Sequence, residues 1–152
     1  MGTSSQGRKV VNEGEYPPFV ICFDGHCLLC NVWVDLLIKL DRKEIFSFTT
    51  LQSAVGRDFL LANGCEELDF KSTDTIAVVK MGQMTMKSDA VIEILVALKG
   101  PFRAAIIFKL IPLAFRNLIY DWIARHRFQW FGRRDSCRVP SHSDFNKFLN
   151  RS

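Results

Sequence analysis

Long apolar runs are missing from this 152-residue sequence, and so is an apolar segment near its start. A membrane-spanning helix needs about 18 to 20 consecutive apolar residues, and no stretch of the chain approaches that length. Residues 1–16 are polar and lack the apolar segment of a secretory signal peptide. Gln6 stands where a myristoylation signal has Ser or Thr. We therefore expect a cytoplasmic protein, in which residues 1–16 form a flexible tail.

Cysteines are few, odd in number and unevenly spaced. The five thiols are Cys22, Cys27, Cys30, Cys65 and Cys137. A disulfide-stabilised secreted domain would carry an even, denser set of cysteines. This composition argues against a disulfide framework and favours a reducing compartment.

Acidic residues are scarce in one part of the chain. Residues 1–98 hold nine Lys or Arg and thirteen Asp or Glu, whereas residues 99–138 hold nine and two. The net charges of these parts are therefore −4 and +7. The imbalance indicates that the basic segment 99–138 faces an acidic surface, which is the rest of the protein, a partner protein or an anionic membrane.

The pattern of apolar residues predicts alternating strands and helices. Short apolar runs indicate strands, and spacings of three and four indicate helices. The strands are expected at 18–23, 45–50, 75–80 and 84–87, with Gly82 at the tip of a hairpin, and the helices at 28–40, 53–63 and 88–98, the last capped by Ser88 or Asp89. The order β-α-β-α-β-β-α is typical of an α/β, thioredoxin-like fold with a four-stranded mixed sheet.

A further helical segment, residues 102–131, is broken by Pro112 and is rich in aromatic residues. Its periodicity favours core packing, with a membrane-surface or partner-binding face as the alternative. The same periodicity, without a known nucleic-acid-binding motif, argues against nucleic-acid binding. We predict a single domain, with a thioredoxin-like core in residues 17–100 and a C-terminal helical extension, residues 101–152, packed on it.

Two cysteines stand where the first strand gives way to the first helix, in Cys27-Leu28-Leu29-Cys30. The unpaired N–H groups and positive dipole end of a helix N-terminus favour a thiolate, which is the nucleophilic form of cysteine. Cys30 lies one helical turn further along, where it can attack a mixed disulfide formed at Cys27. The junction therefore predicts a redox-active dithiol that exchanges with a disulfide- or thiol-bearing substrate and needs no cofactor.

Two polar residues precede this dithiol. Asp24 ends the strand, where it either caps the following helix or accepts a proton from one of the thiols. His26 comes directly before Cys27, and its protonated ring would stabilise a thiolate; a surface histidine without a role is the alternative. We predict that Asp24 and His26 act with Cys27 and Cys30.

The sequence resembles the DCC family of predicted thiol-disulfide oxidoreductases, whose Asp-Cys-Cys signature is written here as DGHCLLC. The family's later signature, Tyr-x-Trp-x-Ala-x-x-Arg followed by Phe-Gly-x-Arg-x-x-Cys-Arg, is similar to YDWIARHRFQWFGRRDSCRVP at residues 120–140. The resemblance covers residues 18–140. It implies a thioredoxin-like fold and dithiol redox chemistry.

Proline is absent between Pro18 and Pro101. A thioredoxin carries a cis-proline before its third strand, opposite the dithiol, and the resemblance places a residue of 72–75 in that position. Since that proline shapes the substrate groove and helps to keep metals off the cysteines, its absence makes a metal site easier to form.

Cys137 supports two alternative interpretations. It lies close to three arginines in RRDSCR, which would lower its pKa and make it a third redox thiol; a structural cysteine is the other possibility. A zinc or iron–sulfur site, or a protein-interaction module, is the alternative function of the same cysteines. Its ligands would be Cys27, Cys30, Cys137 and His142, although the two pairs are far apart in the sequence.

Overall fold

The computed structural model describes residues 18–65, 76–132 and 145–149. Four strands form one mixed sheet in the order β2-β1-β3-β4. They are β1 (Phe19–Phe23), β2 (Ser47–Thr50), β3 (Ala77–Lys80) and β4 (Gln83–Met86). Strand β1 pairs in parallel with β2 and antiparallel with β3, which forms a hairpin with β4. The sheet and its helices are consistent with a thioredoxin-like fold, so the predicted fold class is confirmed.

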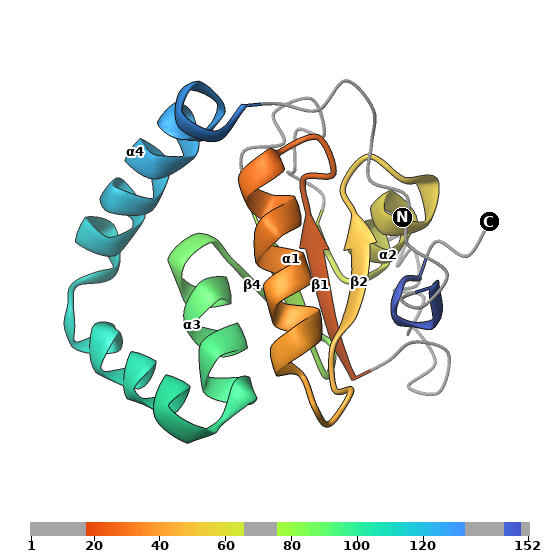
Figure 1. Ribbon diagram of the computed structural model, residues 1–152, viewed down its shortest axis with the longest axis horizontal. Helices are drawn as coiled ribbons and strands as arrows, with labels where there is room; N and C mark the ends of the chain where they lie inside the picture. The colour runs from red at the N-terminus through yellow and green to blue at the C-terminus, as the bar shows by residue number, and fades with distance from the viewer. Residues whose placement is uncertain (1–17, 66–75, 133–144, 150–152) are drawn as a thin grey trace, which may run out of the picture.

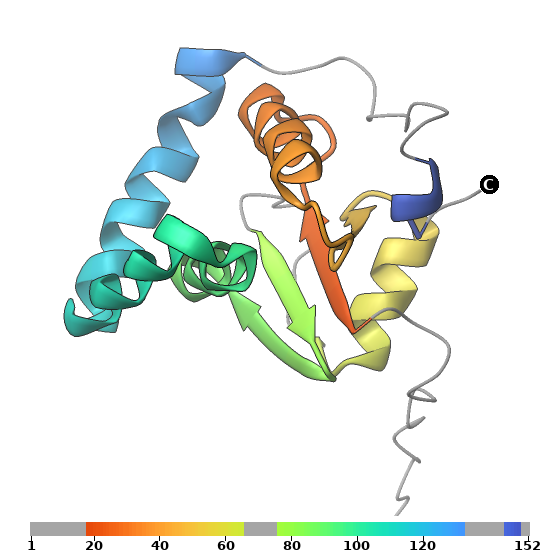
Figure 2. The ribbon, with the colours of Figure 1, turned by 60° about the horizontal axis from the view of Figure 1, so that its bottom comes forward.

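Helices cover both faces of the central strand β1, all five residues of which are buried. Its Ile21 and Phe23 belong to the core beneath α1 (Leu28–Leu40) and α3 (Lys87–Leu98). Its Val20 and Cys22 pack on the other face, beneath α2 (Ala54–Ala62). Figure 2 shows α1 and α2 on opposite sides of the sheet. A strand buried on both faces needs apolar residues at every position, which explains its unbroken apolar run.

The hairpin between β3 and β4 turns at Met81 and Gly82, as predicted. Both residues have positive φ angles, 50° and 79°. Two consecutive positive φ angles match the right-handed twist of the paired strands, and glycine takes such an angle without steric cost. Helix α3 begins directly after β4.

Neither Ser88 nor Asp89 caps α3, so this prediction is wrong. The N-cap is Met86, which makes no side-chain hydrogen bond. The hydroxyl of Ser88 donates to the Asn117 side chain at 2.6 Å, and Asp89 forms an ion pair with Arg116 at 2.7 Å. The two polar side chains therefore hold a later helix instead of their own.

The C-terminal segment forms a 3₁₀ helix, η1 (Gly100–Leu110), and a long helix, α4 (Leu113–Phe131), which meet at Pro112. Figure 1 shows both elements on the α3 side of the molecule, away from α2. A second short 3₁₀ helix, η2 (Phe145–Lys147), is followed by Phe148, which is buried and forms an isolated bridge with Phe48 of β2. None of the described helices is long and apolar enough to cross a membrane.

Core packing does not account for the aromatic side chains of the C-terminal segment, so that interpretation is wrong for most of them. Trp122 is 55% exposed and Trp130 is 52% exposed. Phe108, Phe115 and Phe131 are exposed as well. The buried residues of α4 are instead Ala124 and Arg127.

Candidate functional site

The dithiol lies where the sequence predicted it, between β1 and α1. Cys27 is the N-cap residue of α1, with an extended backbone (φ −76°, ψ 119°). Its Sγ accepts a hydrogen bond from the backbone N–H of Cys30 at 3.3 Å. Cys27 is fully buried, whereas Cys30 is partly exposed. The first turn of the helix therefore holds the Cys27 sulfur with one of its own unpaired amides.

The two thiols differ in acidity. Hydrogen bonds from the Cys30 thiol and from the Cys30 backbone N–H lower the pKa of Cys27 from 9.0 to about 6. The positive charge of Arg127 lowers it further, whereas burial and the charge of Asp24 raise it. The same thiol–thiol hydrogen bond raises the pKa of Cys30, and burial raises it further. At neutral pH, Cys27 is therefore the thiolate and Cys30 keeps its proton.

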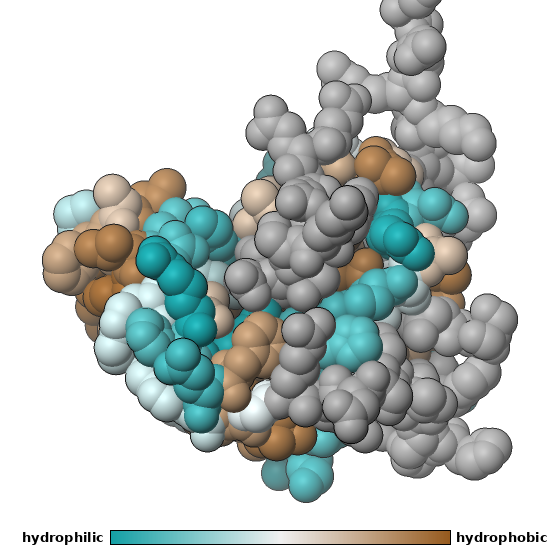
Figure 3. All heavy atoms as spheres, turned by 90° about the horizontal axis from the view of Figure 1, so that it is seen from above, coloured by the Kyte–Doolittle hydropathy of each residue, from teal (hydrophilic) through white to brown (hydrophobic). Residues whose placement is uncertain are grey.

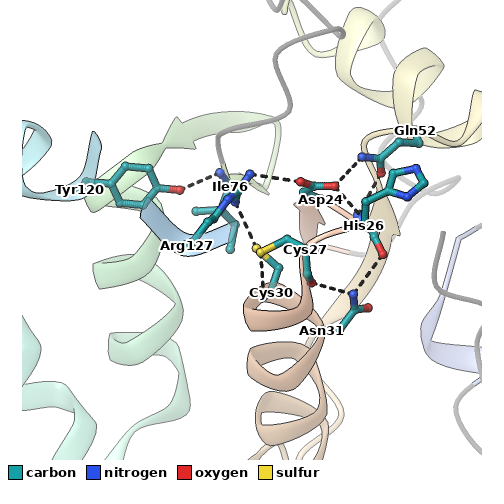
Figure 4. A network of polar contacts seen from close by, with 10 residues as sticks. Asp24, His26, Cys27, Cys30, Asn31, Gln52, Ile76, Tyr120 and Arg127 are labelled. Carbon is teal, nitrogen blue, oxygen red and sulfur yellow. Dashed lines mark hydrogen bonds and ion pairs between the residues drawn. The ribbon is translucent and has the colours of Figure 1, made fainter. Parts of the chain in front are cut away.

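Arg127 of α4 joins the dithiol to Asp24 (Figure 4). Its Nη1 donates to the Cys30 Sγ at 3.3 Å, and its Nη2 forms an ion pair with Asp24 Oδ2 at 3.1 Å. The side chains of Arg127 and Asp24 are 4% and 0% exposed, so the pair lies out of contact with solvent. Sequence reasoning gave Arg127 no role, although it is the last residue of the Tyr-x-Trp-x-Ala-x-x-Arg run.

Asp24 organises the loop that leads into α1, but it is not the helix cap; the capping interpretation is wrong because Cys27 occupies that position. Asp24 Oδ1 accepts hydrogen bonds from the His26 backbone N–H at 2.9 Å and from Gln52 Nε2 at 2.6 Å. Gln52 in turn accepts from the Gly25 backbone N–H at 3.0 Å. The carboxylate thus fixes both the loop and Arg127. Nothing in the sequence pointed to Gln52.

His26 lies beside this network. Figure 4 shows its ring on the Gln52 side of Asp24, whereas both sulfur atoms are on the Arg127 side. The hydrogen bond that joins it to Asp24 comes from its backbone. A role of the His26 ring in thiolate stabilisation therefore stays a prediction.

A buried amide fixes the first turn of α1 to the loop before it. Asn31 is 3% exposed, and its Nδ2 donates to the carbonyl oxygens of Gly25 at 3.0 Å and Cys27 at 2.7 Å. These bonds restrain the backbone on both sides of the Cys27 sulfur. Sequence reasoning missed Asn31, because a polar residue in the first turn of a helix is common at exposed positions.

Some of the predicted ligands and thiols lie outside the part of the chain that the structure describes. Cys137, His142 and residues 72–75 lie outside the described residues, so the third thiol, the metal site and the position opposite the dithiol stay predictions. Among the described residues, no group of three or more His, Cys, Asp or Glu is placed to hold a metal ion. Cys22 is buried in the sheet, and this burial raises its pKa, as expected of an unreactive thiol.

Comparisons with known proteins identify the family. The family model of the DCC1-like thiol-disulfide oxidoreductases matches residues 21–133. The chain is 37% identical to YuxK, an uncharacterized protein of Bacillus subtilis, over 89% of this chain and 96% of YuxK. It is 34% identical to a chloroplastic DCC family protein of Arabidopsis thaliana, over 79% of this chain and 69% of the plant protein. No solved structure is significantly similar to it. The match spans the dithiol, Asp24 and Arg127, and the chain therefore belongs to the DCC1-like thiol-disulfide oxidoreductase family.

Proposed function

We propose that this protein is a thiol-disulfide oxidoreductase that exchanges its Cys27–Cys30 dithiol with a disulfide in a protein or a small thiol compound. The observation that carries the proposal is the Cys27 sulfur, held at the N-terminus of α1 with its pKa lowered to about 6. A pKa below the ambient pH makes the thiolate the main form of Cys27 in a neutral solution. The membership in the family agrees with this chemistry.

Two steps complete the exchange. The Cys27 thiolate attacks one sulfur of the substrate disulfide, forming a mixed disulfide and releasing the other substrate sulfur as a thiolate. Cys30 then gives its proton to the released substrate thiolate or to water and attacks the Cys27 sulfur. This attack breaks the mixed disulfide, frees the second substrate thiolate and leaves a Cys27–Cys30 disulfide. Two electrons pass from the dithiol to the substrate, and a reductant of the thiol class must restore the dithiol.

Arg127 is placed to activate the second thiol after the first step. The Cys30 pKa is raised mainly by the hydrogen bond to Cys27, and the Cys27 charge adds to this effect. Both contributions are lost once Cys27 is bound to the substrate and carries no charge. The guanidinium of Arg127, which lowers the Cys30 pKa, then favours the Cys30 thiolate. Asp24 takes part by fixing Arg127.

Access to Cys27 is the remaining requirement. Cys27 is fully buried, whereas Cys30 is partly exposed as a residue. Attack by Cys27 therefore requires the side chains around it to move. The metal-binding alternative gains no support from the described residues, and purification under reducing conditions followed by metal analysis tests it.

A pH titration of the reduced protein tests the proposed thiolate. The ultraviolet absorbance of the thiolate is expected to rise with a midpoint near pH 6, and this transition is expected to be absent from Cys27→Ser. Iodoacetamide labelling at neutral pH then measures access to the sulfur. A midpoint near that of free cysteine, at about pH 8.5, would contradict the proposal, as would failure of Cys27 to react with any labelling reagent.

The lowered pKa also predicts how stability depends on pH. A thiol whose pKa is lower in the folded state stabilises the fold above its unfolded pKa, and this contribution is lost as the pH falls through the folded pKa. For Cys27 the window runs from 9.0 down to about 6. As the pH is lowered across this window, the free energy of unfolding of the reduced protein, relative to that of Cys27→Ser, is therefore expected to fall. Urea unfolding at several pH values measures it, and a flat difference would be evidence against the lowered pKa.

A further inference from the structure

Helix α4 contacts the rest of the protein through its polar side. Arg116, Asn117 and Asp121 bind Asp89, Ser88 and Lys87 of α3, at 2.7, 2.6 and 3.0 Å. On the same side, the Tyr120 hydroxyl accepts a hydrogen bond from the Ile76 backbone N–H at 3.0 Å, and Arg127 forms an ion pair with Asp24. A surface helix normally buries its apolar side. In α4 this arrangement is reversed, so its apolar side faces outward.

The outward side of α4 carries large apolar residues at helical spacing. Each is at least 40% exposed, and they are Phe115, Leu118, Ile119, Trp122, Ile123 and Trp130. Their spacings of three, one, three, one and seven place them along one stripe of the helix. The rings of Trp122, His126 and Trp130 pack against one another, with centroids 5.1, 5.2 and 5.6 Å apart. The tryptophans thus form part of an ordered aromatic surface.

The preceding 3₁₀ helix η1 also exposes large apolar residues. Its exposed apolar residues are Ile106, Ile107, Phe108 and Leu110, the last of them 84% exposed. We call these residues, with the six of α4, the apolar face. Figure 3 shows hydrophobic atoms gathered at the end of the molecule that α4 forms. Scattered apolar residues are normal on a protein surface, whereas a gathering of large apolar residues marks an interaction site.

Basic residues outnumber acidic ones in the segment that carries the apolar face, and its Lys109 and Arg116 are paired with Glu93 and Asp89 of α3. Lys99, Arg103 and Arg125 are exposed, and none of them forms an ion pair within the described part of the chain. The only carboxylate in residues 99–132 is Asp121, which is bound to Lys87. The charge next to the apolar face is therefore positive, and the surface that covers it has to be acidic or neutral.

We propose that the apolar face binds the surface of an anionic lipid membrane. An interfacial helix buries apolar residues at the boundary between headgroups and acyl chains while nearby Lys and Arg contact anionic headgroups, and tryptophan favours that boundary. A second copy of the chain is a poorer partner, because pairing two such faces would bring their cations together. Binding would carry the dithiol, which contacts α4 through Arg127, to the membrane surface.

Vesicle sedimentation tests this proposal with the full chain. Vesicles of mixed phosphatidylglycerol and phosphatidylcholine are expected to bind the protein, vesicles of pure phosphatidylcholine to bind it at least about tenfold more weakly, and added salt to weaken binding. Tryptophan fluorescence is expected to shift to shorter wavelength on binding, since Trp122 and Trp130 would leave water. Absence of binding to the anionic vesicles would overturn the proposal.

Paired variants locate the contact. Leu118→Gln with Trp122→Gln is expected to weaken vesicle binding about tenfold or more, because two exposed apolar side chains would no longer enter the membrane. Leu61→Gln with Met81→Gln is the matched control, since these exposed residues lie on α2 and the β3–β4 turn. Equal weakening in both pairs would overturn the assignment. So would a dimer that forms through Trp122 and excludes vesicle binding, as measured by analytical ultracentrifugation.

Discussion

Replacing Cys27 with serine is expected to abolish disulfide exchange, whereas replacing Cys30 with serine is expected to trap a mixed disulfide with the substrate. The first variant lacks the sulfur that is anionic at neutral pH. The second keeps this nucleophile but loses the thiol that resolves the intermediate. Reduction of a model disulfide measures the loss of exchange, and non-reducing electrophoresis with mass spectrometry detects the trapped species and identifies its substrate half.

The pattern of trapping also decides which sulfur attacks first. Cys65→Ala is the control, since this buried thiol lies outside the dithiol and should leave exchange unchanged. Cys137→Ser tests the predicted third thiol in the same assay. If both dithiol variants kept equal exchange activity, the proposed function would be wrong. If Cys27→Ser trapped the substrate and Cys30→Ser did not, attack would begin at the more exposed Cys30, and the order of the two steps would be reversed.

Local sequence was sufficient to predict the elements that form the dithiol site. The unbroken apolar run of β1 indicates a buried strand. The regular spacing of apolar residues in 28–40 indicates a helix, and α1 has the bounds that were predicted. The position of Cys27 at the start of that helix follows from these two elements alone. Its interaction with the first turn could therefore be predicted without knowledge of the tertiary structure.

Contacts that depend on tertiary packing could not be predicted in this way. Arg127 lies 97 residues after Cys30 and 103 after Asp24, and Gln52 lies 28 residues after Asp24. No local pattern pairs residues at such separations. The resemblance to the DCC family marked Arg127 as part of a signature, but only the packing of α4 shows that its partners are Asp24 and Cys30.

Helix α4 shows why periodicity alone did not predict burial. The spacing of its apolar residues correctly indicated a helix, but periodicity does not specify which side of a helix faces the protein. The polar side of α4 carries partners for three consecutive polar residues of α3, Lys87, Ser88 and Asp89. Those contacts orient the helix with its apolar side outward. Helix α3 begins at Lys87, so its N-cap residue is Met86, whose side chain has no oxygen that could cap the helix.

Removing the Arg127 side chain is expected to destabilise the fold strongly. Arg127→Met leaves the Asp24 carboxylate buried without its counter-charge, at a cost of about 3–5 kcal/mol in the free energy of unfolding. Arg116→Met on the same helix is the matched control, because the Arg116–Asp89 pair is less buried, and its loss should cost about 1 kcal/mol. Urea unfolding of the reduced proteins measures both values. Equal losses in the two variants would show that burial does not determine how much the Arg127–Asp24 pair contributes to the free energy of unfolding.

The two residues of this pair are expected to change the pKa of Cys27 in opposite directions. Arg127 lowers the Cys27 pKa and Asp24 raises it. The thiolate titration of Arg127→Met should therefore move to higher pH and that of Asp24→Asn to lower pH, while Arg116→Met leaves it unchanged. In the double variant Asp24→Asn/Arg127→Met, the loss of stability should be about 2 kcal/mol less than the sum of the single losses, because neither charge remains unpaired. Shifts of the same sign in both single variants would mean that they act by loosening the site, and Arg127 would then be a structural residue instead of one that positions charge beside the dithiol.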